Sequence, residues 1–98
     1  MSFRQQCYEL LKLIPKGKVT TYAEIAKALD SKAYRAVGSA MAKNRDLIHT
    51  PCHRVVRSNA DVGEYALGSD KKISLLQEEG LLIENGKVKN FKEVFFSF

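Results

Sequence analysis

Residues 21–43, TYAEIAKALDSKAYRAVGSAMAK, decide the fold of this chain. Thr21 and Glu24 stand three residues apart at its start, which is the spacing of a capping box that satisfies free backbone amides at a helix start. Apolar side chains then recur at the spacing of one helix face, at Tyr22, Ile25, Ala26 and Leu29. The first part of the stretch therefore predicts a short amphipathic helix that ends near Asp30.

A second helix is predicted directly after Asp30-Ser31. Its apolar face would consist of Ala33, Ala36, Val37, Ala40 and Met41, and its opposite face of Lys32, Arg35, Ser39 and Lys43. Two short helices with a tight connection predict a helix-turn-helix from about residue 21 to residue 44. The small residues would let this backbone approach a groove, but alanine-rich helices with exposed Lys and Arg also occur without nucleic acid, so both interpretations stay open here.

Further helices and a hairpin are predicted on either side of this unit. A first helix is indicated by the helical spacing of Phe3, Cys7, Leu10, Leu11 and Ile14, which ends before Pro15 and places Cys7 in the core. Ser69 would cap another helix that ends at Gly80. Asn85-Gly86 predicts a two-residue β-hairpin turn. We therefore expect a mainly α, winged helix-turn-helix-like single domain over residues 1–98, with a small β-hairpin.

The composition narrows the class of protein. The chain has 98 residues, and 45% of them are hydrophobic, which is enough for one modest core. Its sixteen Lys and Arg outnumber eleven Asp and Glu, and the net charge of +5 favours a polyanionic partner. Neither a signal-peptide pattern nor an apolar run that could cross a bilayer is present, so we expect an intracellular protein of the cytoplasm, nucleoid or nucleus without a membrane partner. Both cysteines are expected to be free thiols.

Reactive chemistry is expected in residues 51–56, PCHRVV, where Cys52 and His53 are neighbours. A nearby imidazole, charge or ordered water can turn a thiol into a nucleophilic thiolate. Neighbouring side chains in an extended segment point to opposite faces, so direct proton transfer between these two residues is not assured. A cysteine in an apolar run is also commonly structural, and the spacing of His49, Cys52 and His53 matches no zinc motif, so we predict no metal.

Several motifs stand in a specific order along the chain. They are IPKGKVTTY (14–22), RAVG (35–38), Asn44, PCHRVV (51–56), GEY (63–65) and Glu79. In this order and spacing the chain resembles the C-terminal catalytic domain of the O6-alkylguanine-DNA alkyltransferases, the methylated-DNA-protein-cysteine methyltransferase family. The resemblance implies a protein that binds double-stranded DNA, rotates an O6-alkylguanine out of the stack and takes its alkyl group irreversibly on a cysteine. It implies a single-turnover cysteine S-methyltransferase that works as a monomer and without a cofactor.

The resemblance implies a role for each residue of the catalytic group. Cys52 would be the alkyl acceptor, because displacement at an alkyl carbon needs a soft nucleophile such as a thiolate. His53 would remove the thiol proton through a water molecule, and Glu79 would orient the imidazole. Asn44 would brace the turn around the cysteine, and Tyr65 would donate a hydrogen bond or proton to the leaving guanine.

A DNA-binding surface is also implied. Tyr22 would press on the phosphate 3′ of the target, and Arg35 would fill the stack that the flipped base leaves. On the exposed face of the same helix, Lys32, Ser39 and Lys43 would contact or attract phosphates without sequence preference.

The implied substrate pocket contains the Val55 carbonyl, the Ala66 amide and the Leu67 side chain. Ala66 and Leu67 stand where the family has small residues, so Leu67 is expected at the pocket mouth, where it predicts a preference for methyl over bulky adducts. The proline-rich approach of the family to its active site is replaced here by RDLIHT (45–50).

Two other functions stay open on the sequence. A non-catalytic alkyltransferase-like protein would bind and flip the lesion and recruit another repair pathway, although such relatives replace the motif cysteine that is present here as Cys52. A winged-helix transcription factor would explain the basic charge and the helices but not Cys52, Tyr65 and Glu79 together. It should also prefer a base sequence where a repair protein prefers a lesion.

Overall fold

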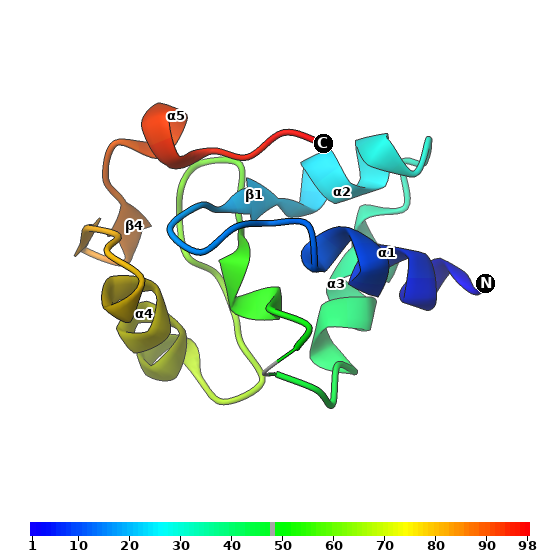
Figure 1. The fold of residues 1–98 in the computed structure, drawn as a ribbon, viewed down its shortest axis with the longest axis horizontal. Helices are drawn as coiled ribbons and strands as arrows, with labels where there is room; N and C mark the ends of the chain where they lie inside the picture. The colour runs from blue at the N-terminus through cyan, green and yellow to red at the C-terminus, as the bar shows by residue number, and fades with distance from the viewer. Residues whose placement is uncertain (48) are drawn as a thin grey trace.

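The helices gather in two groups on either side of a short parallel strand pair (Figure 1). A computed structural model describes residues 1–47 and 49–98. Its elements in chain order are α1 (Phe3–Leu11), β1 (Thr20–Thr21), α2 (Tyr22–Ala28), α3 (Tyr34–Ala42), the 3₁₀ turn η1 (Cys52–Arg54), β2 (Val55–Val56), α4 (Ser69–Glu78), β3 (Ile83–Glu84), β4 (Lys87–Val88) and α5 (Phe91–Val94). The prediction of a mainly helical domain with a small β-hairpin is confirmed. None of the helices in this part of the chain is long and apolar enough to cross a membrane.

α1 begins with a complete capping box that was not among the predicted caps. The Ser2 hydroxyl accepts from the Gln5 amide at 3.1 Å, and the Gln5 side chain accepts from the Ser2 amide at 3.1 Å. The helix ends at Leu11, short of Pro15, and Cys7 is fully buried in the core as predicted.

α2 begins where the sequence predicts it. The Thr21 hydroxyl accepts from the Glu24 amide at 3.0 Å and so caps the helix. In a full capping box the Glu24 carboxylate would accept from the Thr21 amide. It accepts instead from the Ser97 hydroxyl at 3.1 Å, so only the Thr21 half of the predicted capping box is present.

α3 begins at Tyr34, with Ala33 as its N-cap. It packs against α1 and α2 through three buried side chains, Val37, Ala40 and Met41. The prediction that Ala33 and Ala36 belong to this buried face is wrong, because both residues are exposed. Ala33 precedes the first turn, and Ala36 points beside the stripe that positions 37, 40 and 41 define on a helix of 3.6 residues per turn.

The parallel pair of β1 and β2 separates two clusters of the core. Thr20 pairs with Val55 and Thr21 with Val56. One cluster is built from α1, α2 and α3 together with Cys52 and Val55. The other contains residues of β2, α4 and β4 and of the segments that connect the elements, namely Val19, Val56, Val62, Leu76, Leu81 and Val88. Because β2 directly follows η1, this pairing holds the PCHRVV segment at the centre of the molecule.

The N-terminus of α4 differs from the prediction. Ser69 does not cap this helix; it is the first helical residue, and Gly68, with φ at +96°, precedes it as N-cap. The Ser69 hydroxyl instead donates to the Gly63 carbonyl at 3.2 Å, which ties the start of α4 to the preceding loop.

The C-terminal end of α4 and the hairpin confirm two predicted turns. Gly80 adopts φ of +95°, and the Leu81 amide donates to the Leu76 carbonyl at 3.1 Å, as in a Schellman motif. Asn85 and Gly86, with φ of +53° and +74°, form the turn between β3 and β4.

The last residues of the chain run back along β1 (Figure 1). The Val19 amide donates to the Val94 carbonyl at 2.9 Å, and the Phe96 amide donates to the Val19 carbonyl at 2.7 Å. The Thr20 hydroxyl donates to the Phe96 carbonyl at 2.9 Å. This segment therefore steadies the strand that leads directly into α2.

Replacing the glycine after α4 should destabilise the fold, whereas replacing a helical glycine should not. We expect Gly80→Ala to lower the free energy of unfolding by about 1 kcal/mol, because a Cβ is strained at positive φ. Gly38 lies within α3, and a Cβ built there meets no atom within 4 Å, so Gly38→Ala should raise stability by about 0.5–1 kcal/mol. Urea unfolding of both variants would measure these changes; an unchanged midpoint for Gly80→Ala would contradict the role given to its conformation.

Candidate active site

Cys52 begins the 3₁₀ turn η1 rather than lying in an extended segment. Its amide donates to the Thr50 carbonyl at 2.8 Å, and its side chain lines a cavity although the residue is only 4% exposed. A 3₁₀ turn has three residues per turn, so successive side chains point in directions roughly a third of a turn apart. The side chains of Cys52 and His53 can therefore point in different directions and contact different parts of the structure.

His53 points to Glu79 at the end of α4. Its Nε2 atom lies 2.9 Å from Glu79 Oε2, and both side chains are about nine-tenths buried. The Arg54 guanidinium donates to the same carboxylate, from Nε to Oε1 at 3.0 Å and from Nη2 to Oε2 at 2.7 Å. Burial raises the pKa of Glu79, but the hydrogen bonds from Arg54 and His53 outweigh it and hold that pKa below its ordinary value. Glu79 is therefore a carboxylate, and Nε2 of His53 carries the hydrogen of this bond.

The remaining ring nitrogen of His53 is an acceptor. Burial lowers the pKa of His53, although Glu79 opposes this shift, so the ring is neutral at physiological pH. With its hydrogen on Nε2, the ring has a lone pair on Nδ1. Nδ1 is buried and has no hydrogen-bond partner among the described residues. Of the two ring nitrogens of His53, Nδ1 is thus the one that can accept a proton.

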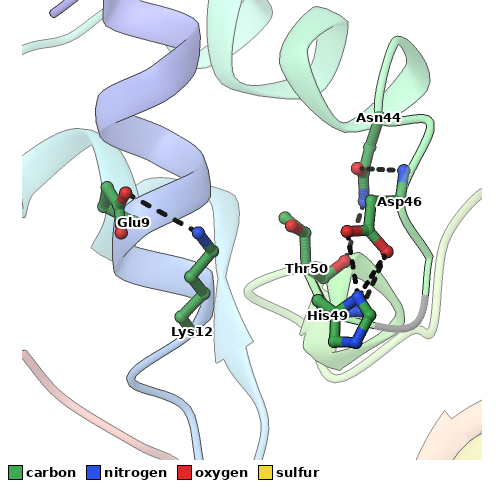
Figure 2. A network of polar contacts seen from close by, with 6 residues as sticks. All are labelled: Glu9, Lys12, Asn44, Asp46, His49 and Thr50. Atoms are coloured by element: carbon green, nitrogen blue, oxygen red, sulfur yellow. Dashed lines mark hydrogen bonds and ion pairs between the residues drawn. The ribbon is translucent and has the colours of Figure 1, made fainter.

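Asn44 holds the loop that leads to Cys52. Its Nδ2 donates to the Thr50 carbonyl at 2.8 Å, and its Oδ1 accepts from the Asp46 amide at 3.1 Å (Figure 2). The Asp46 carboxylate accepts in turn from the His49 amide at 3.0 Å. Ile48, within the segment that replaces the proline-rich approach, lies outside the described residues. Because the Thr50 carbonyl also accepts from Cys52, Asn44 positions the turn at the cysteine through one shared atom.

Lys72 is a site residue that was not predicted. Its side chain is fully buried, and its Nζ donates to the Val55 carbonyl at 2.7 Å and to the Glu64 carbonyl at 3.0 Å. The same Nζ lies 5.9 Å from the centre of the Tyr22 ring. Burial lowers the pKa of Lys72 to about 8. The sequence carried one signal for this position, because Lys72 lies four residues before the buried Leu76 on the same helix face.

The charge on Lys72 matters for the thiol. Burial raises the pKa of Cys52, and a hydrogen bond with the Asn44 side chain and the positive charge of Lys72 both act in the opposite direction. Burial also raises the pKa of Tyr22 and of Tyr65, so both phenols keep their protons and can donate hydrogen bonds. The Tyr65 ring stands edge-on to His53, with centroids 6.4 Å apart.

The cavity in front of Cys52 has a volume of about 590 Å³. On the α3 side its lining is Tyr34, Arg35, Gly38, Met41 and Ala42. On the other side the lining is Tyr22, Cys52, Arg57, Glu64, Tyr65 and Ala66. The structure thus brings five predicted site residues together at one cavity, Tyr22, Arg35, Cys52, Tyr65 and Ala66. It adds residues that were not predicted for the site, four from α3 (Tyr34, Gly38, Met41 and Ala42) together with Arg57 and Glu64.

The other predicted residues lie around this cavity rather than in its wall. His53, Glu79 and Asn44 belong to the hydrogen-bond network of the Cys52 turn. Lys32, Ser39 and Lys43 are exposed on or beside α3. The Val55 side chain is buried in the core, and its carbonyl accepts from Lys72. Leu67 is 59% exposed and is not part of the cavity lining, so the basis for a size limit at the pocket mouth is missing.

Removing the buried charge of Lys72 should make the Cys52 thiol harder to ionise. We expect Lys72→Met to shift the pH profile of Cys52 alkylation by iodoacetamide to higher pH, because a positive charge that lowers the thiol pKa is lost. Lys71→Met is the matched control, since Lys71 is an exposed neighbour on the same helix. An unchanged profile for Lys72→Met would show that this charge does not act on the sulfur.

The family model and two of the relatives that match this sequence are named as methyltransferases. The model of the family "6-O-methylguanine DNA methyltransferase, DNA binding domain" matches residues 2–81. A bifunctional methyltransferase/endonuclease of Picrophilus torridus is 45% identical over 82 residues, which are 83% of this chain and 28% of the relative. A methylated-DNA-protein-cysteine methyltransferase of Metallosphaera sedula is 42% identical over 88 residues, 90% of this chain and 55% of the relative. The chain thus spans about half or less of the length of these relatives.

Solved structures show the same relationship. The S. pombe protein Atl1, in complex with damaged DNA containing O6-carboxymethylguanine, is 32% identical with a TM-score of 0.85, and the match covers 98% of this chain and 95% of Atl1. The O6-methylguanine-DNA methyltransferase of Pyrococcus kodakaraensis is 43% identical with a TM-score of 0.75, over 83% of this chain and 47% of that protein. A family model that matches most of the residues, together with these relatives, shows that the chain belongs to the 6-O-methylguanine DNA methyltransferase family.

Proposed function

We propose that this chain repairs DNA by taking the alkyl group of an O6-alkylguanine on the sulfur of Cys52. One observation carries the proposal: a cysteine that lines an open cavity is followed by a histidine whose ring is held by a buried carboxylate. In this proposal the chain corresponds to the C-terminal catalytic domain of its longer relatives, and it works in the intracellular compartment that holds DNA. Each protein molecule reacts once, because the thioether that forms is not reversed.

The transfer begins with the proton of the thiol. Nδ1 of His53 accepts this proton through a water molecule, while Nε2–H stays bonded to Glu79, which stabilises the imidazolium. The thiolate then attacks the alkyl carbon, so that a carbon–sulfur bond forms and the bond from that carbon to guanine O6 breaks. The electron pair of the broken bond stays on the guanine. Tyr65 donates to the departing base, and its raised pKa keeps the phenol protonated for this purpose.

DNA binding is assigned to the helix pair of α2 and α3. In this proposal the pair is a helix-turn-helix, with β3 and β4 as its small wing, and α3 enters a groove. Lys32, Ser39 and Lys43 contact phosphates, which supports binding without sequence preference. Tyr22 presses on the phosphate 3′ of the lesion, and Arg35 fills the gap that the flipped base leaves, which partly offsets the cost of unstacking. The N-terminal end of α3 is exposed and has no side-chain cap, which supports placing this end of the helix at the DNA.

A non-catalytic lesion sensor is the second candidate. Its support is the S. pombe protein Atl1, which this chain matches over almost the full length of both proteins and which was solved with O6-carboxymethylguanine in DNA. Cys52 is evidence against a sensor, because a protein that only binds the lesion needs neither a thiol at the cavity nor a histidine that can accept the thiol proton. The winged-helix regulator has no such support, since it leaves the His53 and Glu79 pair without a purpose.

Intact mass of the protein after reaction separates these candidates. After incubation with duplex DNA bearing O6-methylguanine, we expect the chain to gain the mass of one CH2 unit, because a methyl group replaces the thiol hydrogen, and peptide mapping should locate this gain on Cys52. Cys52→Ala should bind the lesion and gain no mass, whereas Cys7→Ala, which changes a buried core thiol, should still be methylated. Lesion binding without a mass gain in the unaltered protein would establish the sensor instead.

The exposed position of Leu67 leads to a test of adduct size. Because Leu67 is outside the cavity lining, Leu67→Ala should leave the ratio of transfer rates for O6-methylguanine and O6-benzylguanine in DNA unchanged. Ala66→Leu serves as the contrasting variant, since Ala66 lines the cavity and a larger side chain there should slow the benzyl adduct more than the methyl one. A large gain in benzyl transfer for Leu67→Ala would restore Leu67 as a gate.

A further inference from the structure

Tyr34 lies at the entrance of the Cys52 cavity and has no evident task in the fold. It is the first residue of α3, directly before Arg35, and it is 52% exposed. Within residues 1–47 and 49–98, its hydroxyl makes no hydrogen bond and its ring makes no contact with another aromatic ring. The buried side of α3 is made by Val37, Ala40 and Met41 instead. The ring is therefore not held by the core.

The position of Tyr34 between two hollows is informative. It lines the cavity of Cys52, and it also lines a second cavity of about 420 Å³ formed by α2 and its connection to α3. Tyr34 thus borders both hollows. A flat side chain that is free of the core and borders the space in front of the reactive sulfur can contact a molecule that enters this space.

The neighbours of Tyr34 on the surface of α3 are mostly small, apart from Arg35. The exposed and cavity-lining part of α3 otherwise consists largely of small side chains, Ala33, Ala36, Gly38, Ser39 and Ala42. Two large planar groups, the Tyr34 phenol and the Arg35 guanidinium, stand next to each other at one end of this surface. Arg35 makes no ion pair within the described residues. Planar groups of both kinds stack on nucleobases.

We propose that Tyr34 binds the flipped nucleotide by packing its ring against it at the mouth of the Cys52 cavity. This inference rests on the proposed function, because it requires that the cavity receives a nucleotide. Arg35 would occupy the gap in the stack, and Tyr34 would hold the nucleotide that left it, opposite the loop that carries Tyr65. Base flipping leaves a gap in the stack and an extrahelical base, and the two neighbouring side chains would each contact one of these. Tyr34 therefore adds affinity only when a base is extrahelical.

The test compares lesion-bearing and undamaged duplexes of one sequence, with all variants in a Cys52→Ala background so that no transfer occurs. Tyr34→Ala should weaken binding of the O6-methylguanine duplex by about 5- to 100-fold, as expected for loss of one stacked aromatic ring, and should change binding of the undamaged duplex by less than about twofold. Tyr34→Phe should retain the lesion affinity, because the ring remains. Tyr34→Leu, which is apolar but not planar, should lose most of it.

Lys32→Ala provides the matched control. Lys32 lies two residues before Tyr34 and is exposed, so its loss should weaken both duplexes by a similar factor and lower the salt dependence of binding. Circular dichroism spectra of the variants would verify that α3 is intact.

The outcomes that overturn the proposal are distinct. Equal weakening of both duplexes by Tyr34→Ala would mark a backbone contact, and a loss by Tyr34→Phe as large as that by Tyr34→Ala would mark a role for the hydroxyl instead of the ring. Unchanged lesion affinity in Tyr34→Ala would overturn the role of Tyr34 alone. Failure of the Cys52→Ala protein itself to prefer the lesion would overturn the proposed function and this inference with it.

Discussion

The buried carboxylate of Glu79 holds together three segments that are far apart in the chain. It accepts from His53 and from Arg54, and Arg54 also donates to the Ile14 carbonyl at 2.7 Å. Taking two charges out of water offsets much of their attraction, so such a pair adds little net stability, but losing one partner leaves a buried charge unpaired. The ion pair therefore acts mainly as a geometric constraint. α4 cannot move away from the η1 turn without breaking it, and the His53 ring keeps one tautomer and one orientation.

The pKa of the Cys52 thiol is subject to two opposing effects. Cys52 is buried in the core cluster of α1, α2 and α3, and this burial raises the pKa of its thiol. Asn44 and Lys72 act against this rise, one through a hydrogen bond and one through its charge. Lys72 can be buried because two backbone carbonyls, those of Val55 and Glu64, accept from its ammonium group. Lys72 thus joins the segment of Cys52 to the segment of Tyr65, and its charge favours the thiolate.

Much of the fold and of the site was predictable, and the errors have identifiable causes. The cap at Thr21, the stop at Gly80 and the turn at Asn85-Gly86 follow from local backbone chemistry, and all three are present. Ser69 looked like a cap, but Gly68 can adopt a positive φ and so took that position. Ala33 and Ala36 were placed on the buried face because their small apolar side chains fit either environment. Lys72 was missed because a lysine on an apolar stripe is ordinarily assumed to be exposed. Leu67 was placed at the pocket mouth on the resemblance alone, and its position two residues after Tyr65 does not fix the direction of its side chain.

The sequence by itself determined the four longer helices, the hairpin turn, which residues have side chains that could react, and the family to which the chain belongs. These properties depend on residue type and on short spacings, which act over a few bonds. Only the tertiary structure decided that Cys52 faces a cavity while His53 faces Glu79, that the buried Lys72 charge acts on the thiol, and that Tyr34 borders the same space as Cys52. Such relationships depend on the packing of α3, α4 and the β1–β2 pair, because contacts between residues far apart in the chain arise from how buried faces fit together and not from their order in the sequence.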